Sequence, residues 1–422
     1  MGKPSFPRKS QTFSCYTARR PILPFIYCMP ITTNNLLQRL PKLTHPILFW
    51  DGQAQVATLA HSPRKWLRLM TLVELKDWLA TLKHSPHLPE TDTAQWHSFQ
   101  SGWAGYFSYE AGHALLTGEN RTPHLPLAEF GWYEGSEQIT LTQLPRFNAE
   151  QSVLSWHSAW PYSRYQQAFN QVQNYLRAGD CYQVNLALPF SCNENLTERS
   201  PLALLQSFNP TFGGYLKTAE RTLFSVSPER FMSLSGARIE TRPIKGTVAR
   251  SQDPKQDAAN QAWLKNSAKN QAENLMIVDL LRNDLSRYAK PHSVKVEKLF
   301  ALESHANVHH LVSTISAQKQ PHISMAEVIS SALPGGSITG APKKRAVEII
   351  AELEAAPRHA YCGAMGYFDE RGLADFNILI RTLEAQSSGA QCWAGGGVVL
   401  DSQCQEEWQE LHTKVQRILQ EF

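Results

Sequence analysis

The sequence predicts an α+β fold, because its candidate strands and helices come in mixed blocks rather than in strict alternation. Two further observations support a globular body. Hydrophobic residues make up 42% and charged residues 18% of the 422 residues, an ordinary balance for a chain with a sizeable core. No apolar run approaches the roughly 18 residues of a membrane helix, so we expect a soluble protein that does not act in a membrane.

The clearest element is a helix predicted over residues 163–179. Its apolar side chains recur every three or four residues and form one face. Ser163 is placed to cap its start and Gly179 to end it. The apolar positions are Tyr165, Phe169, Val172 and Leu176.

The remaining elements follow in chain order. Strands are predicted where β-branched and aromatic residues cluster between turn residues, and helices where long segments lack Gly and Pro. The predicted strands are residues 181–190, 222–226, 231–241, 361–368, 375–384 and 391–400. The predicted helices are residues 257–283, 341–355 and 405–420, the second with Pro342 in its first turn.

Composition divides the chain into three parts. Residues 1–28 form a basic prefix without Asp or Glu, which is typical either of a targeting peptide or of a misassigned start before Met29. We favour the later start. Residues 29–150 form an N-terminal portion, which a segment rich in Pro and Ser joins to the main region at residues 151–422.

Charge argues against a nucleic-acid partner. Five of the 41 basic residues lie in the prefix, so 36 remain against 37 acidic residues, and no basic stripe is present. The seven cysteines include no C-x-x-C pair. Their odd number and spacing favour reduced thiols in a cytoplasmic protein over a zinc site or a disulfide framework.

Lys245 and Glu229 are the candidate reactive pair. Lys245 stands between apolar residues and Gly246 just after a strand, where partial burial lowers the pKa of an ammonium and makes it a nucleophile. Glu229, in a Ser-Pro-Glu-Arg-Phe turn, is a candidate general acid, because the intervening strands can bring it close to Lys245. For each residue the alternative is a charged side chain in a surface turn.

Three carboxylates are candidate metal ligands. Glu273 lies in the long predicted helix, and Glu407 and Glu410 share one face of the last helix with Lys414. Carboxylates from two helices suit Mg²⁺, which leaves other positions to water and substrate oxygens. The alternative for Glu410 and Lys414 is a plain ion pair between residues four apart.

Glycine-rich segments and one arginine are candidate anion sites. Residues 333–343 form a loop that enters a helix, where backbone N–H groups favour a carboxylate. The loop lacks the spacing of a nucleotide-binding motif. Arg381 can bind a second carboxylate through two hydrogen bonds, and Gly395, Gly396 and Gly397 let a ligand approach the backbone. Together these features predict a pocket for a small dianion.

These segments resemble the chorismate-utilizing enzyme family, which includes anthranilate synthase component I, aminodeoxychorismate synthase component I, isochorismate synthase and salicylate synthase. The resemblance runs over residues 163–418 and is looser over 30–145. The matching segments are residues 179–186, 227–231, 243–247 (Pro-Ile-Lys-Gly-Thr), 273–280, 310–313, 335–343 (Gly-Gly-Ser-Ile-Thr-Gly-Ala-Pro-Lys), 380–382 and 395–397.

Two positions discriminate within the family. Anthranilate synthases are similar around Lys245 but carry Ala there, whereas a lysine resembles the members that aminate chorismate at C4 and implies covalent catalysis. Isochorismate and salicylate synthases carry a lysine base where this chain has Gln183. A neutral amide cannot remove a proton from water, which argues against hydration of the substrate.

The resemblance implies a role for each site residue. Lys245 would add to chorismate while Glu229 protonates the departing C4 hydroxyl. Mg²⁺ would be held by Glu273 and Glu410, with Glu407 nearby. The substrate-binding residues would be Thr247, His310, Thr339, Tyr361, Arg381, Gly395, Gly396 and Gly397.

The resemblance also implies a fold and partners. The fold is an anthranilate synthase component I-like body of two similar halves with facing antiparallel sheets and outer helices. Ammonia comes from a glutamine amidotransferase subunit, which must be another chain because no glutaminase motif is present here. Tryptophan is a candidate ligand of the N-terminal portion, although no motif for it stands out.

The expected function is Mg²⁺-dependent amination of chorismate at C4, on the route to 4-aminobenzoate and folate. Two alternatives stay open. The first is anthranilate synthase component I, which aminates C2 and releases pyruvate. The second is a non-catalytic, ligand-binding regulatory subunit on the same fold, since fold alone does not fix function.

Overall fold

The computed structural model describes residues 40, 43–82, 94–146, 154–304 and 308–422. The basic prefix at residues 1–28 and the proposed start at Met29 lie outside the described residues.

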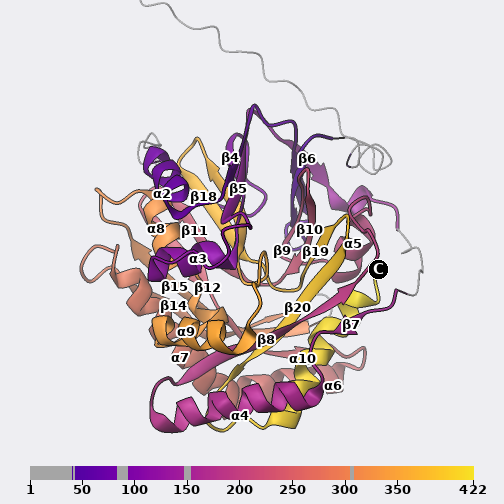
Figure 1. The fold of residues 1–422 in the computed structure, drawn as a ribbon, viewed down its shortest axis with the longest axis vertical. Coiled ribbons are helices and arrows are strands. Elements are labelled where there is room, and N and C mark those ends of the chain that lie inside the picture. The colour runs from indigo at the N-terminus through magenta and orange to yellow at the C-terminus, as the bar shows by residue number, and fades with distance from the viewer. Residues whose placement is uncertain (1–39, 41–42, 83–93, 147–153, 305–307) are drawn as a thin grey trace, which may run out of the picture.

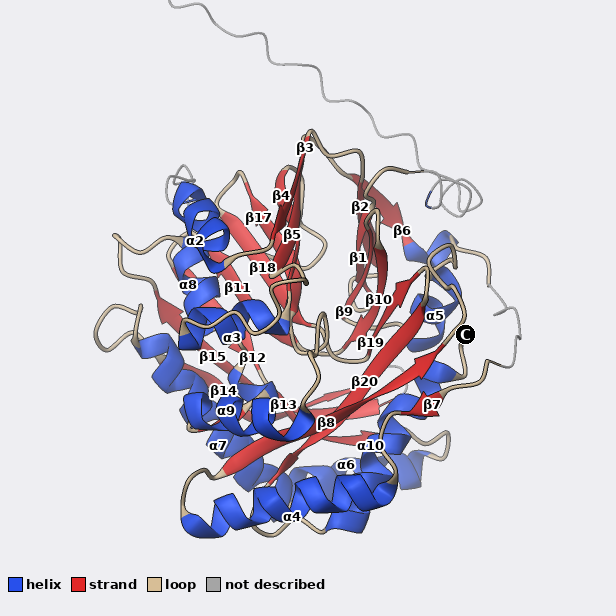
Figure 2. Ribbon diagram, viewed as in Figure 1, coloured by secondary structure: helices blue, strands red, loops and turns tan. Residues whose placement is uncertain are grey.

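Two large sheets form the body, and they face each other across the molecule (Figures 1 and 2). Each has ten strands among the described residues, and every pairing within them is antiparallel. The first sheet has the order β16-β8-β20-β19-β10-β9-β1-β2-β6, with β7 beside β8. The second has the order β13-β15-β12-β11-β18-β17-β4-β5-β3, with β14 beside β15. The predicted α+β fold with facing antiparallel sheets is confirmed.

The strands of the first sheet are β1 (Ile47–Asp51), β2 (Val56–Ala60), β6 (Glu137–Thr140), β7 (His157–Ser158), β8 (Gln183–Cys192), β9 (Phe212–Lys217), β10 (Arg221–Ser227), β16 (Gly340–Ala341), β19 (Thr382–Gln386) and β20 (Gly389–Val398). Those of the second are β3 (Lys65–Leu69), β4 (Gly102–Phe107), β5 (Ala128–Tyr133), β11 (Arg230–Ser235), β12 (Arg238–Arg242), β13 (Ile244–Ala249), β14 (Lys295–Ser304), β15 (Val308–Gln318), β17 (Ala364–Asp369) and β18 (Leu373–Ile378). The N-terminal portion therefore contributes three strands to one end of each sheet.

Helices cover the outside of the sheets (Figure 2). They are α2 (Leu72–Thr81), α3 (Tyr109–Thr117), α4 (Tyr162–Ala178), α5 (Leu202–Phe208), α6 (Pro254–Asn266), α7 (Ala268–Ser286), α8 (Met325–Ala332), α9 (Lys343–Glu354) and α10 (Cys404–Leu419), with short 3₁₀ turns η3 (Leu141–Gln143) and η4 (Gly336–Ile338).

Strand alternation divides the core into two layers. On β1, Ile47 and Phe49 belong to an aromatic cluster between the sheets, whereas Leu48 and Trp50 belong to the larger cluster beneath the helices. Successive side chains of a strand point to opposite faces, so both faces of this strand are buried. This double burial explains why several strands appear in the sequence as continuous apolar runs.

The predicted helix after residue 162 is confirmed as α4, which ends at Gly179 in the left-handed conformation (φ 80). Its start was placed wrongly, since Pro161 and not Ser163 occupies the cap position. Likewise α9 begins at Lys343, so Pro342 is its cap residue rather than part of its first turn.

Three predicted segments are each divided in two. The helix over 257–283 breaks at Ser267, whose hydroxyl accepts a hydrogen bond from Asn270 N and so caps α7. The strand over 231–241 is the hairpin of β11 and β12. The strand over 375–384 crosses from β18 in the second sheet to β19 in the first. The local sequence predicts one continuous element in each segment but not the change of direction within it.

Candidate active site

The fold brings together three of the site residues that the sequence predicts, from one strand and two connecting segments. Lys245 lies in β13, Glu229 in the turn between β10 and β11, and Arg381 in the crossing between β18 and β19. Their charges act on one another: Glu229 raises the pKa of Lys245, while Lys245 and Arg381 lower that of Glu229. The three groups therefore share one electrostatic environment.

Glu229 is buried and is held in place by hydrogen bonds. It is 6% exposed, and its Oε1 accepts a 2.7 Å hydrogen bond from Ser337 Oγ. Its backbone N–H donates to Ser227 Oγ at 3.2 Å, and Ser227 in turn donates to Ile378 O at 2.6 Å. Burial raises the pKa of Glu229 despite the opposing effects of Ser337 and Lys245. The surface-turn alternative is wrong for this residue, and a carboxyl that keeps its proton is suited to general acid catalysis.

Lys245 is half-buried and forms no ion pair with any residue that the structure describes. Burial lowers the pKa of its ammonium, although Glu229 and Glu273 pull in the other direction. A lowered pKa increases the fraction of free amine near neutral pH, and the free amine is the nucleophilic form. A lowered pKa and the lack of an ion pair among the described residues are the properties that a nucleophilic lysine requires.

Two of the expected ring-lining residues are neighbours across a strand pair. Thr247 on β13 lies opposite His310 on β15, with 2.8 Å between Thr247 Oγ1 and His310 Nδ1. Thr339 differs from them: it is fully buried, and its hydroxyl donates to Gly335 O at 2.8 Å. Its side chain is thus engaged within the glycine-rich loop, and its own carbonyl accepts a hydrogen bond from Asn185 N at 2.7 Å.

Arg381 has the features of an anion-binding residue. It adopts a left-handed backbone (φ 51), which is strained for a residue with a side chain. Its half-buried guanidinium forms no ion pair or hydrogen bond within the described part of the chain, and burial lowers its pKa. A guanidinium without a carboxylate partner is available to bind a carboxylate through two hydrogen bonds.

Tyr361 is fixed between aromatic and cationic neighbours. Its ring stacks on Trp393 with centroids 5.8 Å apart, and Arg358 Cζ lies 5.6 Å from its centroid. Arg358 is itself buried, where it donates to Glu354 Oε1 at 2.6 Å and to Asn185 O at 2.8 Å. Tyr361 therefore has little freedom to rotate.

The triple glycine of β20 leaves space for neighbouring side chains. A Cβ on Gly396 would lie 2.9 Å from Glu407 Oε2, and one on Gly397 would lie 3.0 Å from the amide of Gln183. Gln183 is 2% exposed, and its Nε2 has no hydrogen-bond partner among the residues that the structure describes. Side chains at these glycines would displace polar groups that border the site.

Carboxylates from two helices approach Lys245. Glu273 of α7 and Glu410 of α10 both raise its pKa, which places them in its electrostatic environment. Glu407 is buried and accepts a 2.8 Å hydrogen bond from Ser402. Within residues 43–82, 94–146, 154–304 and 308–422, no three His, Cys, Asp or Glu side chains form a metal-binding group. Carboxylate oxygens on α7 and α10 are nevertheless the kind of donor that Mg²⁺ prefers, and this cation keeps water and substrate oxygens as further ligands.

The ion pair between Glu410 and Lys414, which was the alternative to a metal-binding role, is present in the structure. Lys414 Nζ lies 2.7 Å from Glu410 Oε1 and donates to Gly395 O at 3.2 Å. The pair is largely exposed and so contributes little stability. A carboxylate in such a pair keeps oxygen lone pairs for a cation.

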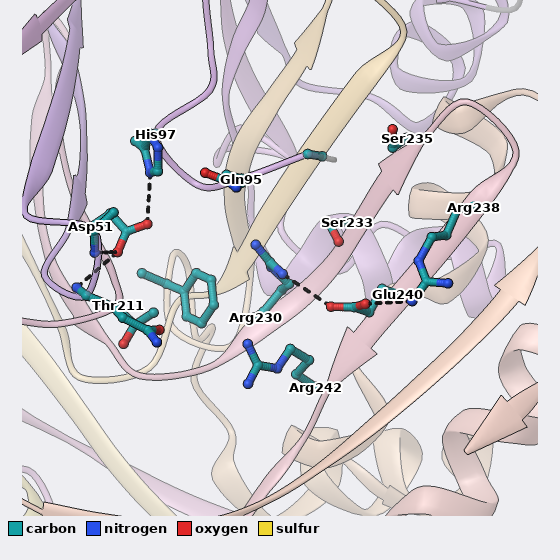
Figure 3. Close-up of a pocket in the computed structure, with 14 residues that line it drawn as sticks. Asp51, Gln95, His97, Thr211, Arg230, Ser233, Ser235, Arg238, Glu240 and Arg242 are labelled. Carbon is teal, nitrogen blue, oxygen red and sulfur yellow. Dashed lines mark hydrogen bonds and ion pairs between the residues drawn. The ribbon is translucent and has the colours of Figure 1, made fainter. Parts of the chain in front are cut away.

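A separate cavity of about 400 Å³ lies between the N-terminal portion and β11 and β12 (Figure 3). On one side His97 Nδ1 meets Asp51 Oδ2 at 2.9 Å. On the other, Glu240 accepts from Arg238 at 3.1 Å and lies 3.5 Å from Arg230. Its lining combines charged groups of both signs with apolar residues such as Phe212, which the isolated strand sequences did not indicate.

The sequence reasoning missed several residues that support the site. Ser337 and Lys343 stood inside the matching loop but were assigned no role, and Asp284 was not considered. Asp284 forms a buried ion pair with Lys343, with 2.6 Å between Asp284 Oδ2 and Lys343 Nζ. The sequence did contain a signal for these supporting residues, because Ser337 lies within the glycine-rich loop and Lys343 follows directly after it.

Comparisons with known proteins identify the family. Residues 44–420 match the family model described as chorismate binding enzyme. This chain belongs to the chorismate-binding enzyme family. Aminodeoxychorismate synthase component 1 of Klebsiella aerogenes is 41% identical over 363 residues, which are 80% of this chain and 78% of that protein. The protein of the same name from Salmonella typhimurium is 37% identical over 403 residues, 88% of each chain.

The fold also matches that of a solved structure. Anthranilate synthase component I from Streptococcus pneumoniae superposes with a TM-score of 0.74, at 23% identity, over 87% of this chain and 92% of that one. At this identity the likeness establishes the fold alone. In the described part of the present chain, no helix is both long and apolar enough to cross a membrane.

Proposed function

We propose that this chain is the chorismate-aminating component of an aminodeoxychorismate synthase, which converts chorismate to 4-amino-4-deoxychorismate for 4-aminobenzoate and folate synthesis. The observation that carries the proposal is that Lys245 is half-buried, has no ion pair among the described residues, and shares its electrostatic environment with a buried Glu229. The names of relatives at 37% and 41% identity support the same activity.

Chorismate carries two carboxylates, and the site offers a place for each. We assign the pyruvyl carboxylate to Arg381 and Tyr361, since the guanidinium has no partner within the part of the chain that the structure describes and Tyr361 is held by stacking. Thr247 and His310 would line the ring, with Thr339 supporting it from within the loop. Gly395, Gly396 and Gly397 would allow the ring to approach β20.

The reaction would proceed in two displacements. The free amine of Lys245 forms a bond to ring carbon C2, the ring double bonds shift, and the C4–O bond breaks. Glu229 gives its proton to the departing oxygen, which leaves as water. Ammonia then bonds to C4, the ring electrons shift back, and the C2–N bond breaks to release Lys245. One proton of the new ammonium group returns to Glu229, so chorismate and ammonia give aminodeoxychorismate and water.

Mg²⁺ is the proposed cofactor, and Glu273 and Glu410 would hold it, with Glu407 nearby. When bound, a hard divalent cation neutralises the ring carboxylate and fixes its orientation. The protein contributes carboxylates from α7 and α10, two elements whose packing against β13 and β20 is set by the fold.

The proposal includes a second protein and a place in the cell. Ammonia would be supplied by a glutamine amidotransferase subunit, and the cytoplasm is the proposed compartment. Tryptophan remains a proposed ligand of the N-terminal portion, for which the mixed-charge cavity at Asp51 and Arg230 is the candidate place.

The decisive experiment is product analysis after incubation of the purified chain with chorismate, ammonium salt and Mg²⁺. We expect 4-amino-4-deoxychorismate as the main product. Anthranilate as the main product would instead identify an anthranilate synthase component I. A chain that binds chorismate without turnover, yet alters a partner's activity, would support the regulatory alternative.

A further inference from the structure

A buried lysine closes the base of the glycine-rich loop. Lys343, the first residue of α9, donates through Nζ to Ala332 O, the last residue of α8, at 3.0 Å. The same ammonium lies 2.6 Å from Asp284 Oδ2 on α7, and the two side chains are only 7% and 5% exposed. Because Ala332 precedes the loop at residues 333–342 and Lys343 follows it, one side chain joins both ends of the loop to α7.

The loop held in this way carries a direct contact to Glu229. Ser337 Oγ donates to Glu229 Oε1 at 2.7 Å, and both side chains are buried. Helix α7 also supports the adjoining turn: a Cβ on Gly336 would lie 2.7 Å from Leu280 Cδ2 and 3.6 Å from Asp284 Oδ2. The loop is thus packed between α7 and Glu229, and its position sets that of Ser337.

The buried pair is better explained by geometry than by stability. Burial lowers the pKa of Lys343, which reports the cost of an ammonium away from water, and Asp284 offsets that cost in part. Well-packed apolar residues often stabilise such a site equally well, so a buried ion pair is weak evidence for a stabilising role. The pair does bring three segments to one point, because Lys343 Nζ at the start of α9 contacts α7 through Asp284 and the end of α8 through Ala332 O.

We propose that Lys343 and Asp284 are positioning residues, whose ion pair holds loop 333–342 so that Ser337 keeps the Glu229 carboxyl directed at the departing oxygen of the substrate. Neither residue is assigned to contact with the substrate. The inference rests on the proposed function of Glu229 as proton donor.

The test compares Lys343→Met with Lys344→Met, a matched control at the neighbouring exposed lysine. Consumption of chorismate, whatever the product, is measured at saturating ammonium. We expect kcat of Lys343→Met to fall by about ten- to a hundredfold, as for other sub-ångström losses of alignment, with KM for chorismate changed less than about twofold. The control is expected to match the unmodified chain.

A double-mutant cycle separates positioning from general damage. If Lys343 acts through Ser337, adding Lys343→Met to Ser337→Ala should lower kcat by less than about twofold, because the contact is already lost. Asp284→Asn, which preserves size, should show the same non-additivity and replaces Lys343→Met if that variant does not fold. Losses that multiply, or near-normal kcat in Lys343→Met, would overturn the proposal.

A readout without turnover keeps this inference distinct from the proposed function. Hydrogen exchange of the peptide spanning residues 333–342 should speed up at least tenfold in Lys343→Met and stay unchanged in Lys344→Met. Unchanged exchange in Lys343→Met would refute the clamp even if the enzyme makes aminodeoxychorismate. Absence of that product from the unmodified chain would instead refute the proposed function.

Discussion

Ser337 Oγ and Glu229 Oε1 form a 2.7 Å hydrogen bond between two buried side chains that are 108 residues apart in sequence. The contact connects the glycine-rich loop to the proposed proton donor. It also fixes one carboxyl oxygen of Glu229, leaving the other for a substrate. Several measurable consequences depend on this arrangement and on Lys245 beside it.

Lys245→Arg tests covalent catalysis. Guanidinium keeps the positive charge but stays protonated and cannot attack the ring, so aminodeoxychorismate formation should fall at least a thousandfold. In the unmodified chain, mass spectrometry should detect a substrate adduct on Lys245 that is absent from the variant. Near-normal activity of Lys245→Arg would exclude a covalent lysine without affecting the family assignment.

Lys245→Ala extends this test to product choice. The variant should suppress amination at C4 and open C2 to ammonia, so anthranilate-type product should increase relative to aminodeoxychorismate. Lys255→Ala, at an exposed lysine of α6, is the matched control. Chromatography of the products decides the outcome, and an unaltered product ratio would contradict our placement of Lys245 at C2.

The pH dependence of kcat should be bell-shaped. Burial lowers the pKa of Lys245, and activity declines at low pH as the amine becomes protonated. Burial raises the pKa of Glu229, and activity declines at high pH as the carboxyl loses its proton. Glu229→Gln should lower kcat by about 10²–10⁴ and abolish the high-pH decline. A variant profile that still falls at high pH would assign the acid to another group.

The carboxylates of α7 and α10 should control the response to Mg²⁺. Glu273→Gln or Glu410→Gln should raise the Mg²⁺ concentration for half-maximal activity by at least tenfold, because a neutral amide binds a hard cation weakly. Glu406→Gln, at an exposed position of α10, serves as control. Titration calorimetry with Mg²⁺ and chorismate provides a second measurement. Unchanged Mg²⁺ dependence in both variants would show that the metal site lies elsewhere.

Arg381→Lys should weaken substrate binding more than chemistry. Lysine keeps one charge but loses the two parallel N–H donors that match a carboxylate, so KM for chorismate should rise about tenfold or more. Lysine also has to adopt the left-handed backbone of this position (φ 51), as arginine does. A loss confined to kcat would instead place Arg381 near the reacting carbons.

The chain alone should use ammonium but not glutamine. Addition of a glutamine amidotransferase subunit should confer glutamine-dependent amination and reduce the requirement for ammonium. The assay compares both nitrogen sources with and without that subunit. Efficient glutamine use by the purified chain alone would contradict the partner we propose.

Local patterns were sufficient for much of the fold. The spacing of apolar residues placed α4, and a long segment without Gly or Pro placed α10, each to within two residues. Glycine in its left-handed conformation ended α4 as expected. Helix periodicity and cap chemistry depend on neighbours within a few positions, so they are visible in the sequence.

Segments in which the chain changes direction were less predictable. The run at 375–384 has no Gly or Pro to mark a turn, yet it leaves the second sheet at Ile378 and enters the first at Thr382. Both flanking strands are buried, so hydrophobicity does not mark the crossing. The crossing nevertheless creates the strained backbone of Arg381.

The sequence by itself determined which motifs are present, and through them the family, the reactive lysine and the expected acid. The tertiary structure decided what surrounds these residues. Ser337 donates a hydrogen bond to Glu229, Asp284 forms an ion pair with Lys343, and Lys245 has no ion pair among the described residues. The physical reason is that burial and pairing depend on contacts between segments far apart in the chain. Periodicity reports which face of an element is buried, but not which distant residue covers it.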